Sequence, residues 1–468
     1  MIFSSSIFLY AFLPIFLATY YASPRRARSL VIALFSYLFY GWWRPDFVLL
    51  MLISTVVDYS CGRAIVSARQ ANPDGEGVGK PFLWISLGVN LGLLGYFKYA
   101  NFGIDTVNAL LVANGQAPME WTRVVLPVGI SFYTFQTLSY TVDLYRGHAE
   151  PVKNFTDFMC YVAMFPQLIA GPIVRYHTVA EQLHGRTHSA EKFFYGVVAF
   201  QIGLIKKVLL ADVVADLANS AFGHGPAGFV DAWIGIVAYA FQIYFDFSGY
   251  SDMAIGLGLM IGFHLPINFD RPYASESITD FWRRWHISLS SFLRDYLYIP
   301  LGGNRKGPRR TYVNLMATML LGGLWHGAAW TFVAWGAYQG AFLAFERWCG
   351  KRPLYHRFPR PGRIAITFVI VLGGWVFFRA PDIGFAFDYL STMAGFGGDF
   401  DDATPLFVRP THYLGLGIGA FVLWCMPTTQ ERLLNLRTGY VLLLQALFIL
   451  ALLHLHYQDH VPFLYYQF

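Results

Sequence analysis

Long apolar runs recur along the whole chain, and only brief polar connections separate them. A helix that crosses a bilayer needs about 20 predominantly apolar residues. The pattern therefore predicts an all-α, polytopic membrane protein with roughly 10–13 membrane segments, some short or re-entrant, in one integral membrane domain over residues 1–468. Windows that meet or approach the required length lie near 5–22, 29–57 (interrupted at Arg44-Pro45-Asp46), 82–99, 124–142, 155–174, 193–212, 229–246, 251–264, 313–332, 334–348, 364–380, 413–428 and 439–456.

Three polar stretches stand out between the apolar runs. Segments 62–81 and 396–412 predict loops, and neither is long enough for a second domain. Residues 244–254 place Asp246 and Asp252 between two apolar runs, which predicts a polar break. Two interpretations of this break stay open: its carboxylates polarise a histidine or bind a substrate hydroxyl, or it is an interfacial turn with a helix cap.

Segment 277–298 has a different pattern, because its apolar residues recur at helical spacing among basic and hydroxyl residues. Ser277 and Asp280 have the spacing of a helix N-cap. The segment predicts one amphipathic helix at the cytoplasmic membrane interface, since a basic stretch at 305–310 follows it. A basic face that only sets the topology is the alternative interpretation. The apolar stripe consists of Phe281, Trp285, Leu289, Phe292 and Tyr296.

Composition and charge agree with a bilayer as the main solvent. The 468 residues are 56% hydrophobic and 13% charged, whereas about 25% charged is usual in soluble domains. The net charge of +6 does not suggest nucleic acid, because no long basic polar segment stands apart from the apolar runs. Basic clusters at 25–28 and 305–310 predict two cytoplasmic loops and an N-terminus outside. The first residues do not resemble a cleaved signal peptide, because no basic residue precedes the first apolar run.

Metal and hydrolase chemistry have no sequence support. The four cysteines, Cys61, Cys160, Cys349 and Cys425, are far apart and lack paired ligand spacing, so neither a structural metal nor a disulfide framework is expected. The chain also lacks a Gly-rich nucleotide loop, a Gly-x-Ser-x-Gly elbow and a His-Glu-x-x-His pair.

Two histidines are the leading candidates for chemistry. His326 lies in an apolar run beside Gly322, Gly323 and Gly327, and polar groups at membrane depth are functional candidates by default. If the helix begins after Arg310, His326 lies some 24 Å along it. A hydrogen-bonded core histidine in a small-residue packing seam is the alternative.

Other ionisable residues support weaker hypotheses. His286 falls at the edge of the amphipathic stripe, where it either faces a cavity or is a solvated polar residue. Lys98, Lys206 and Lys207 interrupt apolar runs, and we expect them to snorkel to the headgroups.

The chain also resembles the membrane-bound O-acyltransferase family. The runs Trp-Arg-Arg-Trp-His-Ile-Ser-Leu-Ser at 282–290 and Leu-Trp-His-Gly at 324–327 carry this resemblance. Further similar runs at 94–103, 126–133, 168–172, 244–258, 293–299 and 301–307, with the C-terminal Pro-Phe-Leu-Tyr-Tyr-Gln-Phe, are closest to the members that O-acetylate alginate. Relatives that act on cellulose, peptidoglycan or other exported glycans look alike.

The resemblance implies a fold, a site and a donor. The fold would be a ring of helices around a thinned central channel. The essential histidine of the family corresponds to His326 and its second motif histidine to His286. His326 would act as general base, with an acyl-histidine intermediate as the alternative. No bound cofactor is expected, and acetyl-CoA or another acyl thioester would be the donor. The cationic residues that would bind this anionic donor are Arg283, Arg284, Arg305, Lys306, Arg309 and Arg310.

The same resemblance implies a place in the cell and a set of partners. The protein would sit in the bacterial inner membrane and help acetylate an exported polysaccharide. A periplasmic acetyl carrier or acetyltransferase would receive the acetyl group, because no polar segment is long enough to fold outside. Two functions of other classes remain as alternatives: a glycan exporter and a membrane scaffold without catalytic activity.

Overall fold

The computed structural model describes residues 1–468 except 73–74, 76, 401–402, 458–463 and 465–468. The fold is all-α, as predicted, and the described residues form no β-strand beyond one isolated bridge. The chain divides into two compact units, which are described one at a time. Unit 1 comprises residues 1–197 and 254–266, and unit 2 comprises residues 198–253 and 267–468.

Unit 1 contains the N-terminal helices. Its helical segments are η1 (Phe8–Phe12), α1 (Leu13–Ala22), η2 (Arg25–Ala27), α2 (Arg28–Gly41), α3 (Asp46–Ala71), α4 (Lys80–Leu94), η3 (Gly95–Tyr99), α5 (Ala100–Ala113), α6 (Ile130–Arg146), α7 (Phe155–Ala163), α8 (Phe165–Leu168) and α9 (Tyr176–Gly185), and α10 (Ala190–Ile205) begins here. Asp58 on α3 is buried and accepts hydrogen bonds from Asn90 at 2.8 Å and Ser86 at 2.6 Å, both on α4. Hydrogen bonds between polar side chains thus join these two helices, because a buried carboxylate needs hydrogen-bond donors from within the protein.

Unit 2 contains the two candidate histidines. Its helical segments are η4 (Lys206–Ala211), α11 (Asp212–Gly223), the larger part of α12 (Phe229–Met260), η5 (Pro272–Ala274), α13 (Ile278–Arg284), α14 (Ile287–Leu293), η6 (Arg294–Tyr298), α15 (Gly307–His326), α16 (Trp330–Trp348), α17 (Arg360–Arg379), α18 (Ile383–Met393), α19 (Pro410–Cys425), α20 (Thr429–Leu433) and α21 (Thr438–Tyr457). Its main apolar core joins side chains of α11, α12, α13, α16, α17 and α18.

Several predicted boundaries were wrong. The apolar window 229–246 and the second window as far as Met260 belong to one continuous helix, α12, so no break in the helix separates them. The predicted loop at 62–81 was wrong over its first part, because α3 continues to Ala71, and residues 73–74 and 76 of it lie outside the described part. The window 155–174 contains two short helices, α7 and α8, with a non-helical Met164 between them. The loop predicted at 396–412 is confirmed up to α19, apart from residues 401–402, which lie outside the described part.

The single amphipathic helix predicted at 277–298 was also wrong. Ser277 caps the segment as expected, and its side chain accepts a hydrogen bond from the Asp280 N–H. The helix then stops at Trp285, which is extended, and His286 adopts a left-handed conformation with φ 44° and ψ 55°. Four members of the predicted stripe are nevertheless buried, namely Phe281, Trp285, Leu289 and Phe292.

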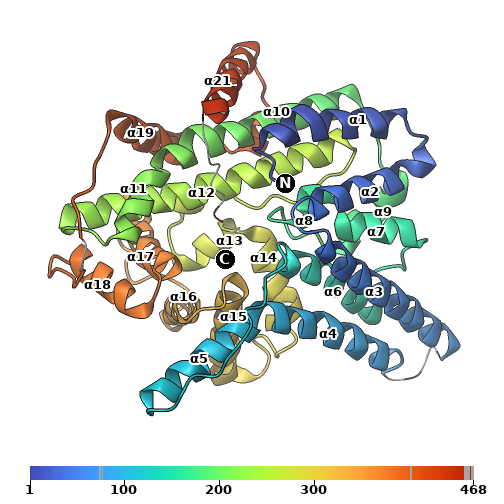
Figure 1. Ribbon diagram of the computed structural model, residues 1–468, viewed down its shortest axis with the longest axis horizontal. Helices are drawn as coiled ribbons and strands as arrows, with labels where there is room; N and C mark the ends of the chain where they lie inside the picture. The colour runs from blue at the N-terminus through green and yellow to red at the C-terminus, as the bar shows by residue number, and fades with distance from the viewer. Residues whose placement is uncertain (73–74, 76, 401–402, 458–463, 465–468) are drawn as a thin grey trace. The chain divides into compact units, whose positions relative to one another are not determined.

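Helices α15 and α16 lie side by side in unit 2 (Figure 1), and they form an antiparallel hairpin because only a short turn joins them. The turn between them comprises Gly327, Ala328 and Ala329. A side chain at Gly323 or Gly327 would clash with Phe332 on α16. These glycines therefore let the two helices approach closely, as small residues do in membrane proteins. His326 is the last residue of α15 and lies beside the turn.

Three described helices are long and apolar enough to cross a membrane, namely α3, α17 and α21. The total number of membrane segments stays a prediction. The assignment of Lys207 and Lys98 to the headgroups was wrong, because both are buried inside their units. The Lys207 side chain is 3% exposed and lies between Asp212 at 2.6 Å and Asp246 at 2.9 Å. Lys98 donates to the Ser131 hydroxyl at 3.3 Å.

Candidate active site

His326 is enclosed by aromatic rings in the core of unit 2. Its ring centroid lies 5.0 Å from that of Trp325, 5.1 Å from Trp335 on α16 and 5.2 Å from Phe378 on α17. The residue is only 5% exposed. The surrounding rings limit access of water, which strengthens electrostatic interactions at a reacting group.

His286 lies beside His326, although 40 positions separate them in the sequence. The two ring centroids are 6.3 Å apart. Phe247 on α12 packs edge-on against His286 at 4.7 Å, and His286 is fully buried. The solvated interfacial position considered from the sequence was therefore wrong, and the structure brings the two candidate histidines into one site.

Asn268, in the segment between α12 and η5, holds His286 in place. Its side-chain oxygen lies 3.0 Å from Nδ1 of His286. The same oxygen accepts hydrogen bonds from the Ser288 N–H at 3.3 Å and the Ser288 hydroxyl at 2.9 Å. Burial lowers the pKa of His286 well below its ordinary value, and the proximity of His326 lowers it further. His286 is therefore neutral in the resting site.

The two carboxylates of residues 244–254 form ion pairs with lysines. Asp252 accepts from Lys206 at 2.6 Å and from the Thr429 hydroxyl at 2.7 Å. Asp246 pairs with Lys207 and also accepts from the Leu464 N–H at 2.9 Å. Buried charges persist in an apolar interior only when they are paired and hydrogen-bonded. Of the two interpretations of residues 244–254, the interfacial turn with a helix cap is excluded, because α12 continues through this segment.

The cationic residues predicted to bind the donor divide into two groups. Arg284 forms ion pairs with Asp280 at 2.9 Å and Asp270 at 4.0 Å, so carboxylates of the protein already compensate its charge. The others are exposed, namely Arg283, Arg305, Lys306, Arg309 and Arg310. Exposure leaves the charges of this second group accessible to an anionic donor.

The exposed cations at 305–310 and the start of α13 lie at the same end of the α15–α16 hairpin, whereas Arg283 lies near the end of α13. Glu346, near the end of α16, accepts from the backbone N–H groups of Ile278 and Thr279 at 2.7 and 2.9 Å. Because α15 and α16 are antiparallel, the basic start of α15 lies at this end too. From there α13 runs along α16, where the Trp282 indole N–H donates a hydrogen bond to the side-chain oxygen of Gln339. The chain then continues from α13 to His286. One short helix, α13, thus extends from the cationic end of the hairpin toward His286.

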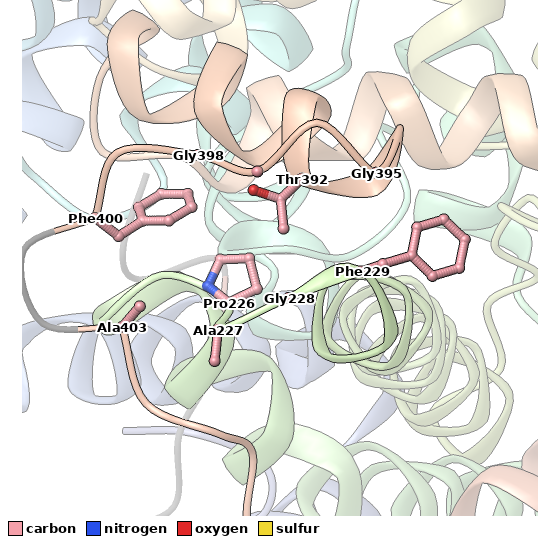
Figure 2. A pocket seen from close by; sticks show the side chains of 10 residues that line it. Pro226, Ala227, Gly228, Phe229, Thr392, Gly395, Gly398, Phe400 and Ala403 are labelled. Carbon is pink, nitrogen blue, oxygen red and sulfur yellow. The ribbon is translucent and has the colours of Figure 1, made fainter.

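A separate cavity of about 270 Å³ lies elsewhere in unit 2. Figure 2 shows Phe229 and Phe400 on opposite sides of it. The lining consists of Pro226, Ala227, Gly228, Phe229, Thr392, Gly395, Gly397, Gly398, Phe400 and Ala403. None of these described side chains ionises, so none of them can act as a general acid or base. No cluster of metal-ligating side chains occurs among the described residues.

Sequence reasoning missed Asn268 and the aromatic enclosure. Asn268 stands in a short connection between apolar residues, and nothing in its local pattern marks it as a partner of His286. Trp335 and Phe378 belong to apolar windows, in which any aromatic residue is expected. These neighbours of His286 and His326 come together only when helices distant in the sequence pack against one another.

Comparison with known proteins places this site in a family. Residues 150–380 match the model of the membrane-bound O-acyltransferase family. The chain is 45% identical to a probable alginate O-acetylase of Pseudomonas putida, with all of both chains covered. It is 50% identical to a probable alginate O-acetylase of Azotobacter vinelandii, covering 85% of this chain and 79% of the relative.

A peptidoglycan O-acetyltransferase of Helicobacter pylori is 37% identical, covering 85% of this chain and 80% of the relative. Matches of this identity over this much of both chains extend far beyond the two histidine motifs. The chain therefore belongs to the membrane-bound O-acyltransferase family and is an acyltransferase of that kind.

Proposed function

We propose that the protein takes an acetyl group from a cytoplasmic acyl thioester and passes it across the bacterial inner membrane for O-acetylation of alginate. The observation that carries this proposal is the pair of buried histidines, His326 and His286, whose rings lie 6.3 Å apart. The relatives named alginate O-acetylase, at 45% and 50% identity, support alginate over peptidoglycan, for which the relative is 37% identical.

In this reaction His326 acts as the general base. An acceptor hydroxyl oxygen attacks the thioester carbonyl carbon, and His326 takes the hydroxyl proton. The carbon–sulfur bond then breaks, and His326 returns the proton to the leaving sulfur, which departs as the thiol. A neutral imidazole suits this task, because its ordinary pKa lies near 6.5. If His326 instead attacks the carbonyl itself, an acyl-histidine intermediate forms, and the hydroxyl reacts with it in a second step.

The donor enters from the basic end of the α15–α16 hairpin. Acetyl-CoA carries phosphates, which arginine side chains bind well. Arg283, Arg309 and Arg310 are exposed and available for this role, whereas Arg284 is already held by Asp280. A periplasmic carrier or acetyltransferase receives the acetyl group outside and delivers it to the polysaccharide.

Complementation tests the acceptor. A Pseudomonas putida strain without its own 45% identical relative would be given this chain, and alginate-bound acetyl would be measured after mild alkaline release. We expect acetylation to be restored by the wild type and not by His326→Gln. The opposite result would be alginate without acetyl groups and peptidoglycan that has gained them, with the wild-type chain at normal abundance. That result would assign peptidoglycan as the acceptor.

A further inference from the structure

The orientation of the Asn268 side-chain amide follows from its partners. A backbone N–H can only donate a hydrogen bond. The amide atom facing the Ser288 N–H, at 3.3 Å, must therefore be the oxygen. The amide nitrogen consequently points the other way, toward the Ser251 hydroxyl on α12 at 3.2 Å, and a hydroxyl can accept this bond. The position of the oxygen thus rests on contacts that do not involve His286.

This orientation decides which nitrogen of His286 carries the proton. Nδ1 lies 3.0 Å from the Asn268 oxygen, which can only accept, so Nδ1 is the protonated nitrogen. A neutral imidazole has one N–H, and Nε2 then has a free lone pair. Nε2 is buried and has no hydrogen-bond partner among the described residues. A buried acceptor without a partner is unfavourable unless a ligand supplies a donor.

We propose that Asn268 is a positioning residue of the acyltransfer site, because it holds His286 in the Nδ1–H form and so presents the Nε2 lone pair as a hydrogen-bond acceptor to bound substrate. In this form His286 accepts a hydrogen bond and cannot donate one from Nε2. His326 performs the proton transfer, and His286 orients a donor group of the substrate beside it. This inference deepens the proposed function and rests on it.

The main chain around His286 supports this role. The Ile287 N–H donates to the backbone oxygen of Asn268 at 3.0 Å, so Asn268 holds both the ring and the peptide that follows it. His286 itself has a positive φ of 44°. A left-handed conformation at a residue other than glycine is unfavourable by about 1–3 kcal/mol and persists where surrounding contacts impose it, often at functional sites. The contacts that impose it here come largely from Asn268.

The test measures the tautomer directly. Solid-state ¹⁵N NMR of histidine-labelled protein in lipid distinguishes protonated from bare ring nitrogens, and the His286 signals are those lost in His286→Gln. We expect protonated Nδ1 and bare Nε2 in the wild type. Asn268→Leu removes the acceptor and should lose this preference, whereas Asn268→Asp retains an acceptor oxygen and should keep it. Ser251→Ala, a matched loss of the bond on the opposite side of Asn268, should also keep the wild-type tautomer.

Activity should follow the tautomer. Asn268→Leu should lower kcat for acetyl transfer by between about 10-fold and 10⁴-fold, the upper figure being the loss caused by a wrong histidine tautomer in a serine protease. Its donor KM should remain near the wild-type value, and Asn268→Asp should recover much of kcat. Because the NMR measurement needs no substrate, it stands even if the acceptor or donor is assigned wrongly.

Three results would overturn the inference. The first is a wild-type His286 with a bare Nδ1 and a protonated Nε2. The second is an Asn268→Leu protein with wild-type tautomer and kcat at normal membrane abundance. The third is equal loss of activity and of abundance in the Leu and Asp variants, which would make Asn268 a purely structural residue.

Discussion

Replacement of His326 by glutamine should leave a folded, inserted protein that transfers almost no acetyl group. Glutamine keeps a hydrogen-bond donor and an acceptor but cannot take up a proton near neutral pH. Loss of a general base lowers the rate by typically about 10²–10⁴-fold, and loss of a nucleophile lowers it more. A rate loss of about 10²–10⁴-fold corresponds to roughly 2.7–5.5 kcal/mol in activation free energy.

His326→Gln is more informative than His326→Ala because aromatic rings enclose the His326 side chain. The His326 ring packs against Trp325, Trp335 and Phe378 at centroid distances of 5.0–5.2 Å. Truncation of a large buried side chain to alanine destabilises by roughly 2–5 kcal/mol, because a cavity remains. This value is similar to the catalytic loss, so a low cellular activity of His326→Ala would not separate the two causes. Glutamine fills more of the space and reduces the cavity contribution.

The assay therefore measures turnover per folded molecule. Purified His326→Gln and wild-type protein in lipid would be given a labelled acyl thioester donor together with the periplasmic partner and polysaccharide, and initial rates would be divided by the amount of monodisperse protein. His264→Gln serves as a matched control, because His264 is exposed whereas His326 is buried. It should transfer acetyl groups at the wild-type rate.

A single result would refute the assignment of His326. If His326→Gln transferred acetyl groups within about threefold of the wild-type rate per folded molecule, neither a general base nor a nucleophile could lie at this position. The residue would then be a packing element between α15, α16 and α17.

Further predictions concern donor binding, stability, topology and partners. Arg283→Ala should raise the donor KM more than it lowers kcat, because loss of uniform binding affects KM, and an unchanged KM would leave Arg283 with a topological role only. Lys207→Met should lower the free energy of unfolding by about 3–5 kcal/mol, since two buried carboxylates lose their cation. Thermal unfolding in detergent checks this. Lys206→Met, which leaves only one carboxylate without its cation, should have the smaller effect. A cysteine placed at position 306 should react with an impermeant reagent only after cells are opened, and labelling of intact cells would contradict a cytoplasmic loop. The purified chain alone should acetylate polymer more slowly than it does with its periplasmic partner, and equal rates would exclude that partner.

Periodicity and composition alone determined much of the protein. The long apolar runs predicted an all-α membrane protein, because a span requires about 20 apolar residues and leaves a strong signal in one sequence. His326 was identified for a related reason: an ionisable group within such a run is unfavourable unless it has a function or a partner. The helix cap at Ser277 and the buried stripe of Phe281, Leu289 and Phe292 are also local features, and the structure contains them.

Tertiary packing decided how these features combine into a site. A helical wheel assumes an unbroken helix, so it could not anticipate the left-handed His286, which redirects the chain and buries the ring beside His326. Lys207 could not be distinguished from a snorkelling lysine, because its partner Asp246 reaches it only after the helical run of Lys207 packs against α12. Asn268 acts on His286 from 18 positions away. Side-chain partners of this kind depend on which helix faces meet in space, and a single sequence does not contain that information in any local pattern.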